Sequence, residues 1–182
     1  MLYLTIDETN DLIREARGDA FHLEVSDDHS QVSDEAEPMR RVLAGLPPFE
    51  DDSYPSTWRA WEDLVSEVTG RGTNMRRVRV VSEPLTDYVR FLHGLTDRNQ
   101  KYGEDIRWLP RHLAGPSDYT TDEWWLIDGE KVAFTIFGTD GDFVGAAVTI
   151  DPVIVARCVA VRDALWDRAI PHRDYSAGMP SE

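Results

Sequence analysis

The stretch from Arg76 to Leu109 constrains the fold more than any other part of the chain. It opens with alternating charged and β-branched residues at Arg77 to Val81, which is the two-residue period of a strand with one face on the core. Pro84 then favours a first helical turn that Ser82 can cap, and an amphipathic helix follows. A second strand is expected from Glu104 to Leu109. Two strands joined by one helix lie parallel, so the stretch predicts a central βαβ unit.

The residues after this unit alternate between apolar runs and turn residues. Two runs, Glu123 to Asp128 and Val132 to Phe137, flank a turn at Gly129-Glu130-Lys131 as in a β-hairpin, and a third strand is expected from Phe143 to Ile150. Asp151-Pro152 then supplies a helix cap and a proline at the first helical position. The whole pattern predicts an α/β fold, in which a mixed sheet with the central parallel unit is followed by a C-terminal β-meander and a closing helix.

The first third of the chain is acidic and mostly helical in its pattern. Residues 1–53 contain 14 acidic and 4 basic residues, and the whole chain has a net charge of −15. Helices are expected over Thr5 to Arg17 and Asp34 to Leu43, on either side of a strand at Ala20 to Val25. An acidic, proline-marked connector at Pro47 to Ser53 is the best internal boundary. We therefore expect a single domain made of an acidic N-terminal region, an α/β core and a C-terminal tail, at residues 1–53, 54–172 and 173–182.

A helix that begins at Ser56 carries Trp58 and Trp61 on the same stripe as its aliphatic residues. Core packing is the favoured interpretation, because large aromatic side chains mostly serve cores. A ligand-stacking or partner surface is the alternative. The stripe therefore predicts substantial burial of both rings.

The charge and the lack of long apolar runs narrow the class of protein. A net charge of −15 repels phosphate backbones, so direct nucleic-acid binding is disfavoured, whereas a basic protein partner would be attracted. No apolar run is long enough to cross a membrane, and Asp7, Glu8 and Asp11 occupy the region where a signal peptide would be apolar. We therefore expect a cytoplasmic protein that does not contact a membrane.

Arg77 and Arg79 form the first candidate site, because they share one face of the predicted strand while valines occupy the other. Two adjacent guanidinium groups can bind a phosphate or a carboxylate in a bidentate manner. Alternatively, both arginines lie on a solvated face or pair with acids of neighbouring strands, for which Glu24 and Asp105 are candidates. This structural interpretation is favoured.

A second candidate site lies where the two predicted parallel strands end. Ligands of open α/β sheets bind at the carboxyl ends of adjacent strands, and the N-terminus of the following helix adds partial positive charge there. The structural alternative is that Glu83 caps the helix and that Arg90 pairs with Asp87 or Glu83. The residues of this candidate crevice are Ser82, Glu83, Arg90, Arg111 and His112.

Acidic residues and histidines offer weaker candidates. Glu104, Asp105 and Asp128 are possible carboxylates of a ligand site. Asp140 and Asp142 lack the spacing and the terminal glutamate of a calcium loop, so a hairpin turn is favoured there over a cation loop. The histidines and the single cysteine show no zinc-site spacing, the cysteine fits a small core residue, and nucleotide-binding and hydrolase motifs are absent. We therefore expect no metal, no cofactor and no catalytic residue.

Three segments of the chain resemble an uncharacterised actinobacterial family, domain of unknown function 6879. They are the AFHLEV strand at Ala20 to Val25, the RVRVVSEPLTDYVRF and GEDIRWLPR pieces between Arg77 and Arg111, and the WWLIDGEKVAF hairpin at Trp124 to Phe134. The resemblance covers nearly the whole chain. It implies no particular activity, because the function of the family is unassigned. Members are often seen alongside helix-turn-helix regulators, which implies a regulatory or toxin-antitoxin-like context.

The later part of the chain also resembles, more faintly, the single phospholipase D-like module of some bacterial regulators. Active members carry a His-x-Lys-x-x-x-x-Asp-Gly pattern, in which the histidine is the nucleophile and the lysine binds phosphate. When Asp128-Gly129 is placed on that Asp-Gly, Thr121 falls at the histidine position and Glu123 at the lysine position. Threonine is a poor nucleophile without a base, and glutamate repels phosphate. The resemblance therefore implies a catalytically silent version of that fold.

These patterns support three hypotheses. The leading one is a non-catalytic regulatory or interaction module whose acidic first third contacts a basic protein partner, such as a DNA-binding regulator. The main alternative is a protein or enzyme that binds a small anionic ligand in the crevice at the C-terminal ends of the parallel strands. Direct DNA binding requires Arg76, Arg77, Arg79 and Arg111 to form one basic patch.

Overall fold

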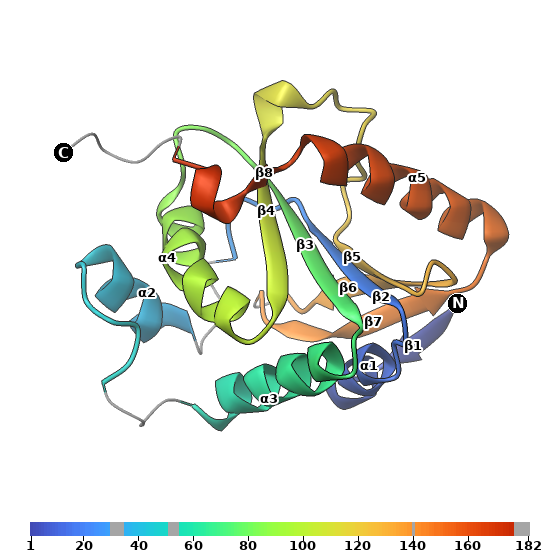
Figure 1. Cartoon of the computed structure of the whole chain (residues 1–182), viewed down its shortest axis with the longest axis horizontal. Helices are drawn as coiled ribbons and strands as arrows, with labels where there is room; N and C mark the ends of the chain where they lie inside the picture. The colour runs from blue at the N-terminus through green and yellow to red at the C-terminus, as the bar shows by residue number, and fades with distance from the viewer. Residues whose placement is uncertain (30–34, 51–54, 140, 177–182) are drawn as a thin grey trace.

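The computed structural model describes residues 1–29, 35–50, 55–139 and 141–176. Within these residues the fold is a mixed α/β fold built on one eight-stranded sheet, in the order β1-β7-β6-β5-β2-β3-β4-β8 (Figure 1). Neighbouring strands in the sheet are often far apart in the sequence. The strands are β1 (Leu2–Leu4), β2 (Asp19–Glu24), β3 (Asn74–Val81), β4 (Glu104–Pro110), β5 (Trp124–Ile127), β6 (Lys131–Phe137), β7 (Phe143–Thr149) and β8 (Ile170–Pro171).

Helices cover both faces of this sheet (Figure 1). Apolar residues of α1 and α3 pack on one face, α4 packs beside them, and α5 alone packs on the opposite face. No helix in the described part of the chain has the length and apolar character needed to span a membrane. The helices are α1 (Ile6–Arg14), α2 (Ala36–Leu43), α3 (Ser56–Gly70), α4 (Asp87–Lys101) and α5 (Pro152–Arg168).

The predicted parallel βαβ unit is confirmed as β3-α4-β4, with Met75 opposite Glu104 and Val81 opposite Pro110. β2 is also parallel to β3. The predicted start of the helix is wrong, since α4 begins at Asp87 and its N-cap is Thr86. Ser82 does not cap the helix, because its backbone N–H and its hydroxyl donate to the Asp27 carboxylate, at 2.8 and 2.7 Å.

The C-terminal meander and the closing helix are also confirmed. β5 and β6 form the expected hairpin, but its turn occupies residues 128–130, one residue earlier than predicted, and Asp128 and Gly129 have left-handed φ angles of 53° and 70°. β7 pairs antiparallel with β6. The Asp151 carboxylate caps α5 by accepting from the backbone N–H groups of Val153 and Ile154, at 2.9 and 3.3 Å.

The acidic first third contributes strands as well as helices. The expected strand at Ala20 to Val25 is β2, which lies between β3 and β5 in the sheet. The expected first helix is shorter than predicted at its C-terminal end, and its Thr5 cap forms a capping box with Glu8. β1 was missed, because three residues are too few for a periodic pattern. Part of the predicted connector, residues 51–53, and the first residue of the predicted turn at Asp140 to Asp142 lie outside the described residues.

β1 lies close against β7 at Gly145, whose φ is +145°. A Cβ atom at this position would lie 2.1 Å from the carbonyl oxygen of Leu4. We therefore expect Gly145→Ala to lower the free energy of unfolding by roughly 2–3 kcal/mol in urea titrations, because it combines backbone strain with a clash. Gly70→Ala is the matched control, since Gly70 ends α3 with open space around it and should lose nothing. Equal losses in the two variants would contradict this explanation.

The first residues of the predicted tail at 173–182 pack on the structure, where the 3-10 helix His172–Asp174 leads into Tyr175. Tyr175 is buried and stacks on Trp108, with ring centroids 5.3 Å apart. The Trp108 indole N–H donates to His172 Nδ1 at 3.0 Å, and the His93 ring lies 4.6 Å from the His172 ring. Burial lowers the pKa of both histidines, and the nearby His93 lowers that of His172 further.

This arrangement predicts an acid-sensitive contribution to stability. Both folded-state pKa values lie below the value of about 6.5 for an unfolded chain, so the unfolded chain binds more protons as the pH falls through that range. The stabilisation present above about pH 6.5 is therefore lost on acidification. Urea titrations at about pH 7.5 and about pH 5.5 should show a smaller loss for His172→Gln than for the wild type. The exposed His112→Gln should behave like the wild type, and identical losses in all three proteins would refute the prediction.

Candidate functional site

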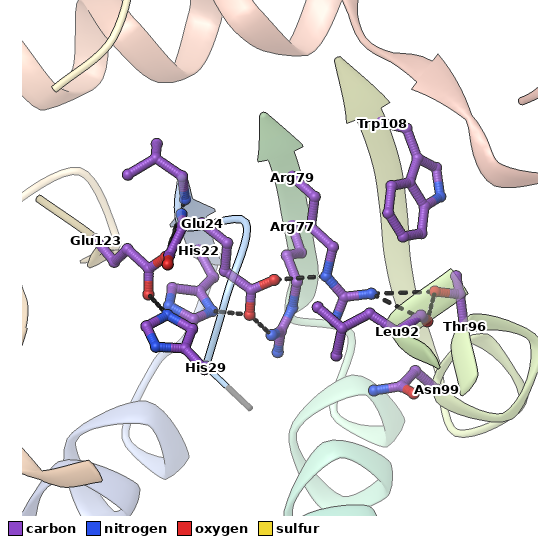
Figure 2. Close-up of polar contacts among 12 residues, drawn as sticks. His22, Glu24, His29, Arg77, Arg79, Leu92, Thr96, Asn99, Trp108 and Glu123 are labelled. Atoms are coloured by element: carbon purple, nitrogen blue, oxygen red, sulfur yellow. Dashed lines mark hydrogen bonds and ion pairs between the residues drawn. The ribbon is translucent and has the colours of Figure 1, made fainter. Parts of the chain in front are cut away.

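Charged and polar side chains occupy the centre of the sheet, on the face covered by α1, α3 and α4 (Figure 2). His22 lies opposite Arg77 across β2 and β3, and Glu24 lies opposite Arg79. Because alternate residues of a strand point to the same side, these four side chains share one face. His22, Arg77 and Arg79 are buried, and the Glu24 side chain keeps only 18% of its surface exposed.

Glu24 links the two arginines (Figure 2). It accepts a hydrogen bond from Arg77, and its other oxygen accepts from Arg79 Nε at 2.5 Å. Arg77 Nε also donates to Glu104 at 2.6 Å, and Arg79 donates to the Thr96 hydroxyl at 3.1 Å. Burial alone would raise the pKa of Glu24, but the two guanidinium groups hold it well below its usual range. The carboxylate is therefore ionised, and each arginine already binds a carboxylate.

Glu123 and His29 extend this row toward β6. One Glu123 oxygen accepts from the backbone N–H groups of Val25 and Ser26, at 3.0 and 2.8 Å, and the other lies 3.2 Å from His29 Nε2. The His29 ring stacks on Phe137 at 4.3 Å. Burial opposes protonation of His29, but the hydrogen bond and the charge of Glu123 outweigh it and raise the pKa. Glu123 therefore ties the end of β2 to His29, and its charge favours the protonated form of that histidine.

His22 is the most unusual member of the row. Its ring stacks on Trp125 at 4.2 Å, and neither ring nitrogen has a hydrogen-bond partner, although Nδ1 lies 3.5 Å from a Glu24 oxygen. Burial and the charge of Arg77 lower its pKa well below the usual value, so the ring is neutral. Thr135 Oγ1 and Glu35 Oε2 are likewise buried without a partner. Buried polar atoms are almost always hydrogen-bonded, so the unpaired atoms of these three side chains mark a candidate site.

The three side chains line one pocket of about 530 Å³ above the polar row. This volume lies within the range of small-molecule sites, which is roughly 300–1,000 Å³. Arg77, Arg79 and Glu104 contribute to its base, whereas α1, α3 and α4 supply its walls. The aromatic members of the lining are Trp58, Trp61, Tyr88, Tyr102, Trp125, Phe137 and Phe143.

Trp58 and Trp61, which the sequence places on a core stripe, are half-buried and face this pocket. Trp61 also packs on Trp125 at 5.8 Å, and Trp58 on Phe49 at 4.9 Å. The predicted burial of the two rings is therefore partial, and the ligand-stacking interpretation stays a prediction. The single cysteine, Cys158, lies on the buried face of α5 in the core, and burial raises its pKa to about 11.

Arg77, Arg79 and Glu104 are the predicted site residues that the structure brings into the pocket. Glu24 is the partner of both arginines, as one alternative predicted, but Asp105 is not. Glu104 pairs with Arg77 instead, because Asp105 points to the opposite face of the sheet and lies 3.8 Å from Arg107. The arginines are not solvated, and they do not form one basic patch with Arg76 and Arg111, so the condition for direct DNA binding is not met.

Ser82 and Arg111 meet at the C-terminal ends of the parallel strands, away from the pocket. Arg111 donates to the Ser82 hydroxyl and to the Asp27 carboxylate, both at 3.2 Å, and to the carbonyl oxygens of Val25 and Val80, at 2.7 and 3.1 Å. These contacts fasten β2 to β3. Arg111 is therefore a structural clamp.

The remaining predicted residues lie outside the pocket lining. Glu83 accepts from the Tyr175 hydroxyl at 2.9 Å and lies 3.5 Å from His112. Arg90 pairs with Asp87 on the surface of α4, which was the structural alternative. Asp128 accepts from the backbone N–H groups of residues 17, 18 and 19 at the opposite end of the sheet.

A family model described as "Domain of unknown function (DUF6879)" matches residues 7–177. The chain belongs to this family. No curated protein matches the chain at a significant level. The described residues of this DUF6879 protein contain no group of three or more His, Cys, Asp or Glu side chains placed to hold a metal ion.

Sequence reasoning missed His22, His29, Glu35 and Thr135 in this DUF6879 protein. A sequence pattern for His22 was present, because His22 and Glu24 alternate with apolar residues in the same way as Arg77 and Arg79 do in the neighbouring strand. Two strands whose polar faces carry opposite charges are expected to pair through those faces when helices cover the sheet. Glu35 and Thr135 carry no comparable local signal.

Proposed function

We propose that this DUF6879 protein is a non-catalytic recognition module that binds a small molecule in the pocket above β2, β3 and β5. The observation that carries the proposal is His22, a buried ring with both nitrogens unpaired at the base of a pocket of about 530 Å³. A ligand that fills the pocket would satisfy His22 together with Thr135 and Glu35. This ligand site differs from the crevice expected at the strand ends, whose Arg111 and Ser82 bind each other.

Several features support binding over catalysis. The described lining contains no serine or cysteine that a base could activate. Glu24 and Glu104 accept hydrogen bonds from arginines, and Glu123 from backbone N–H groups, so these carboxylates serve to hold the site together. A module of this kind binds its ligand and does not convert it into a product.

As part of the same proposal, we infer that the fold is a catalytically silent relative of the phospholipase D-like module. The meander and the closing helix are compatible with it, and Glu123, at the position of the phosphate-binding lysine, holds Val25, Ser26 and His29. Thr121, at the position of the nucleophile, is exposed. These contacts support a scaffold in which the catalytic pattern has been replaced by structural residues.

The test uses His22→Phe, which keeps a flat ring against Trp125 but removes both nitrogens. Wild-type protein is incubated with a small-molecule extract of its native host, desalted and analysed by native mass spectrometry. We expect a small molecule to remain bound to the wild type and to the exposed control His112→Phe, and to be lost from His22→Phe. If no molecule is retained, or if His22→Phe retains it equally, the proposal fails.

A basic protein partner remains a second candidate, favoured by the free edge of β1. β1 ends the sheet and pairs only with β7 among the described strands. Leu2 and Tyr3 in this strand are 63% and 72% exposed, and acids of α1, Asp7 and Asp11, are exposed beside them. Exposed sheet edges can accept an extended segment of a partner as an additional strand. Such a partner would be a basic regulator, and its binding at this edge would weaken with salt.

A further inference from the structure

We propose that the pocket selects a small organic cation, a protonated amine on an apolar body, and excludes anions. This inference rests on the proposed function and names the chemical class of its ligand. The arginines in the sequence suggested an anionic ligand, whereas here we expect the opposite charge. Three properties of the described lining carry it: the balance of charge, the unpaired acceptors and the aromatic walls.

The balance of charge in the lining is negative. Arg77 binds Glu24 and Glu104, Arg79 binds Glu24, and Arg98 binds Glu62 at 2.5 Å. His29 is the remaining source of positive charge, and it is paired with Glu123. Carboxylates outnumber guanidinium groups, with Asp7, Glu24, Glu35, Glu62, Glu104 and Glu123 against Arg77, Arg79 and Arg98. An anion would therefore be repelled, and a cation would be attracted.

Each of the three unpaired side chains offers at least one hydrogen-bond acceptor, although one His22 nitrogen carries an N–H and donates. Neutral His22 has one acceptor nitrogen, Thr135 has a hydroxyl oxygen, and Glu35 has a free carboxylate oxygen. Glu35 lies beside the Tyr88 hydroxyl, and burial raises the pKa of both groups, as expected where negative charge lacks a counter-ion. An ammonium group has three donors and no acceptor. It would therefore supply what this part of the lining lacks.

The separation of His22 and Thr135 also indicates how the ligand is placed in the pocket. His22 is level with Ala133 across β5, so Thr135 lies two strand spacings and two residues along the strand from His22, or roughly 12 Å. One ammonium group cannot reach both. We therefore expect the ammonium group to bind at one end of the pocket, with Glu35 as its counter-ion, and the apolar body to extend across the aromatic walls.

The aromatic side chains of the pocket can pack against the apolar body of the ligand and attract its ammonium group. Ring faces attract cations within about 6 Å of the ring centroid. The rings of this pocket already do so within the protein, since the guanidinium carbon of Arg77 lies 5.7 Å from the Trp125 ring and that of Arg98 lies 5.9 Å from the Tyr102 ring. Trp58, Trp61 and Phe143 offer further half-buried rings.

The experiment compares three probes that share a phenyl ring and a short chain: phenethylammonium, neutral 2-phenylethanol and anionic phenylacetate. Their affinities for the full-length chain are measured by isothermal titration calorimetry at low salt and about pH 8, which lies above the ordinary pKa of a carboxyl group and below that of an alkylammonium group. We expect the amine to bind at least about tenfold more tightly than the alcohol, and phenylacetate to bind more weakly than either.

Glu35→Gln provides the decisive variant, because it keeps the shape of the side chain and removes its charge. It should weaken amine binding about tenfold and leave the alcohol unchanged. Glu37→Gln, at an exposed position in α2 two residues after Glu35, should change neither affinity. Thermal melting of each variant establishes that it is folded.

The outcomes separate this inference from the proposed function. Tighter binding of phenylacetate than of the amine, equal affinities in Glu35→Gln and wild type, or no binding of any probe would each overturn the cation inference. The proposed function would still stand if the host extract yields a ligand that His22→Phe loses. If that extract experiment fails as well, both proposals fail.

Discussion

Replacing Glu24 with glutamine should lower the free energy of unfolding by about 3 kcal/mol. Removing one partner of a buried ion pair typically costs 3–5 kcal/mol, because the opposite charge is left buried without compensation. Here one substitution affects two buried arginines, although Arg77 keeps its contact with Glu104. The Glu24 side chain is 18% exposed, which places the expected loss at the lower end of that range.

Urea unfolding followed by tryptophan fluorescence measures this loss. Glu37→Gln is the matched control, because Glu37 pairs with Arg40 on an exposed helix surface, where such pairs contribute at most about 1 kcal/mol. If Glu24→Gln and Glu37→Gln unfold at the same urea concentration, Glu24 does not link the centre of the sheet as described.

Replacing Trp108 with alanine should cost about 3–5 kcal/mol, the usual range for removing a fully buried aromatic ring. Trp108 is 0% exposed, stacks on Tyr175 and donates its indole N–H to His172. The substitution removes the ring and leaves His172 Nδ1 without its donor. The segment after α5 should therefore detach more readily than the rest of the structure.

Two measurements check this expectation. Urea unfolding gives the total loss, and limited proteolysis should reveal new cleavage after residue 169 in Trp108→Ala before the sheet itself is cut. Trp108→Phe separates the two contributions, because it keeps most of the ring volume and removes the hydrogen bond. Protection of the C-terminal segment in Trp108→Ala equal to that of the wild type would show that another contact holds it.

Local signals explain which parts of the fold were predictable. The alternation around Arg77, the turn at Asp128-Gly129 and the cap at Asp151 each lie within a few residues of the element that they determine, and the βαβ unit, the hairpin and α5 were predicted correctly. The start of α4 was not, because Ser82 is bound by Asp27, 55 residues earlier. A local cap pattern cannot reveal a distant competitor for the same hydroxyl.

The candidate site was likewise predictable where the signal is local and unpredictable where it depends on residues far apart in the sequence. Arg77 and Arg79 stood out in the sequence, and Glu24 was one of the acids considered for them. The pocket itself was missed because its lining comes from residues between positions 6 and 143, and its charge depends on which arginine binds which carboxylate. A pair of arginines suggested an anion site, whereas their paired state in the fold leaves an excess of negative charge.

The position of β2 has a consequence for how the protein is made. β2 needs β3 on one side and β5 on the other, and β1 needs β7, so the sheet joins residues 2–4 and 19–24 to residues 124–149. Sheets built from such distant pairs form slowly. A nascent chain that has not yet extended past residue 127 on the ribosome has no β5, so one edge of β2 stays unpaired and open to aggregation or to chaperones.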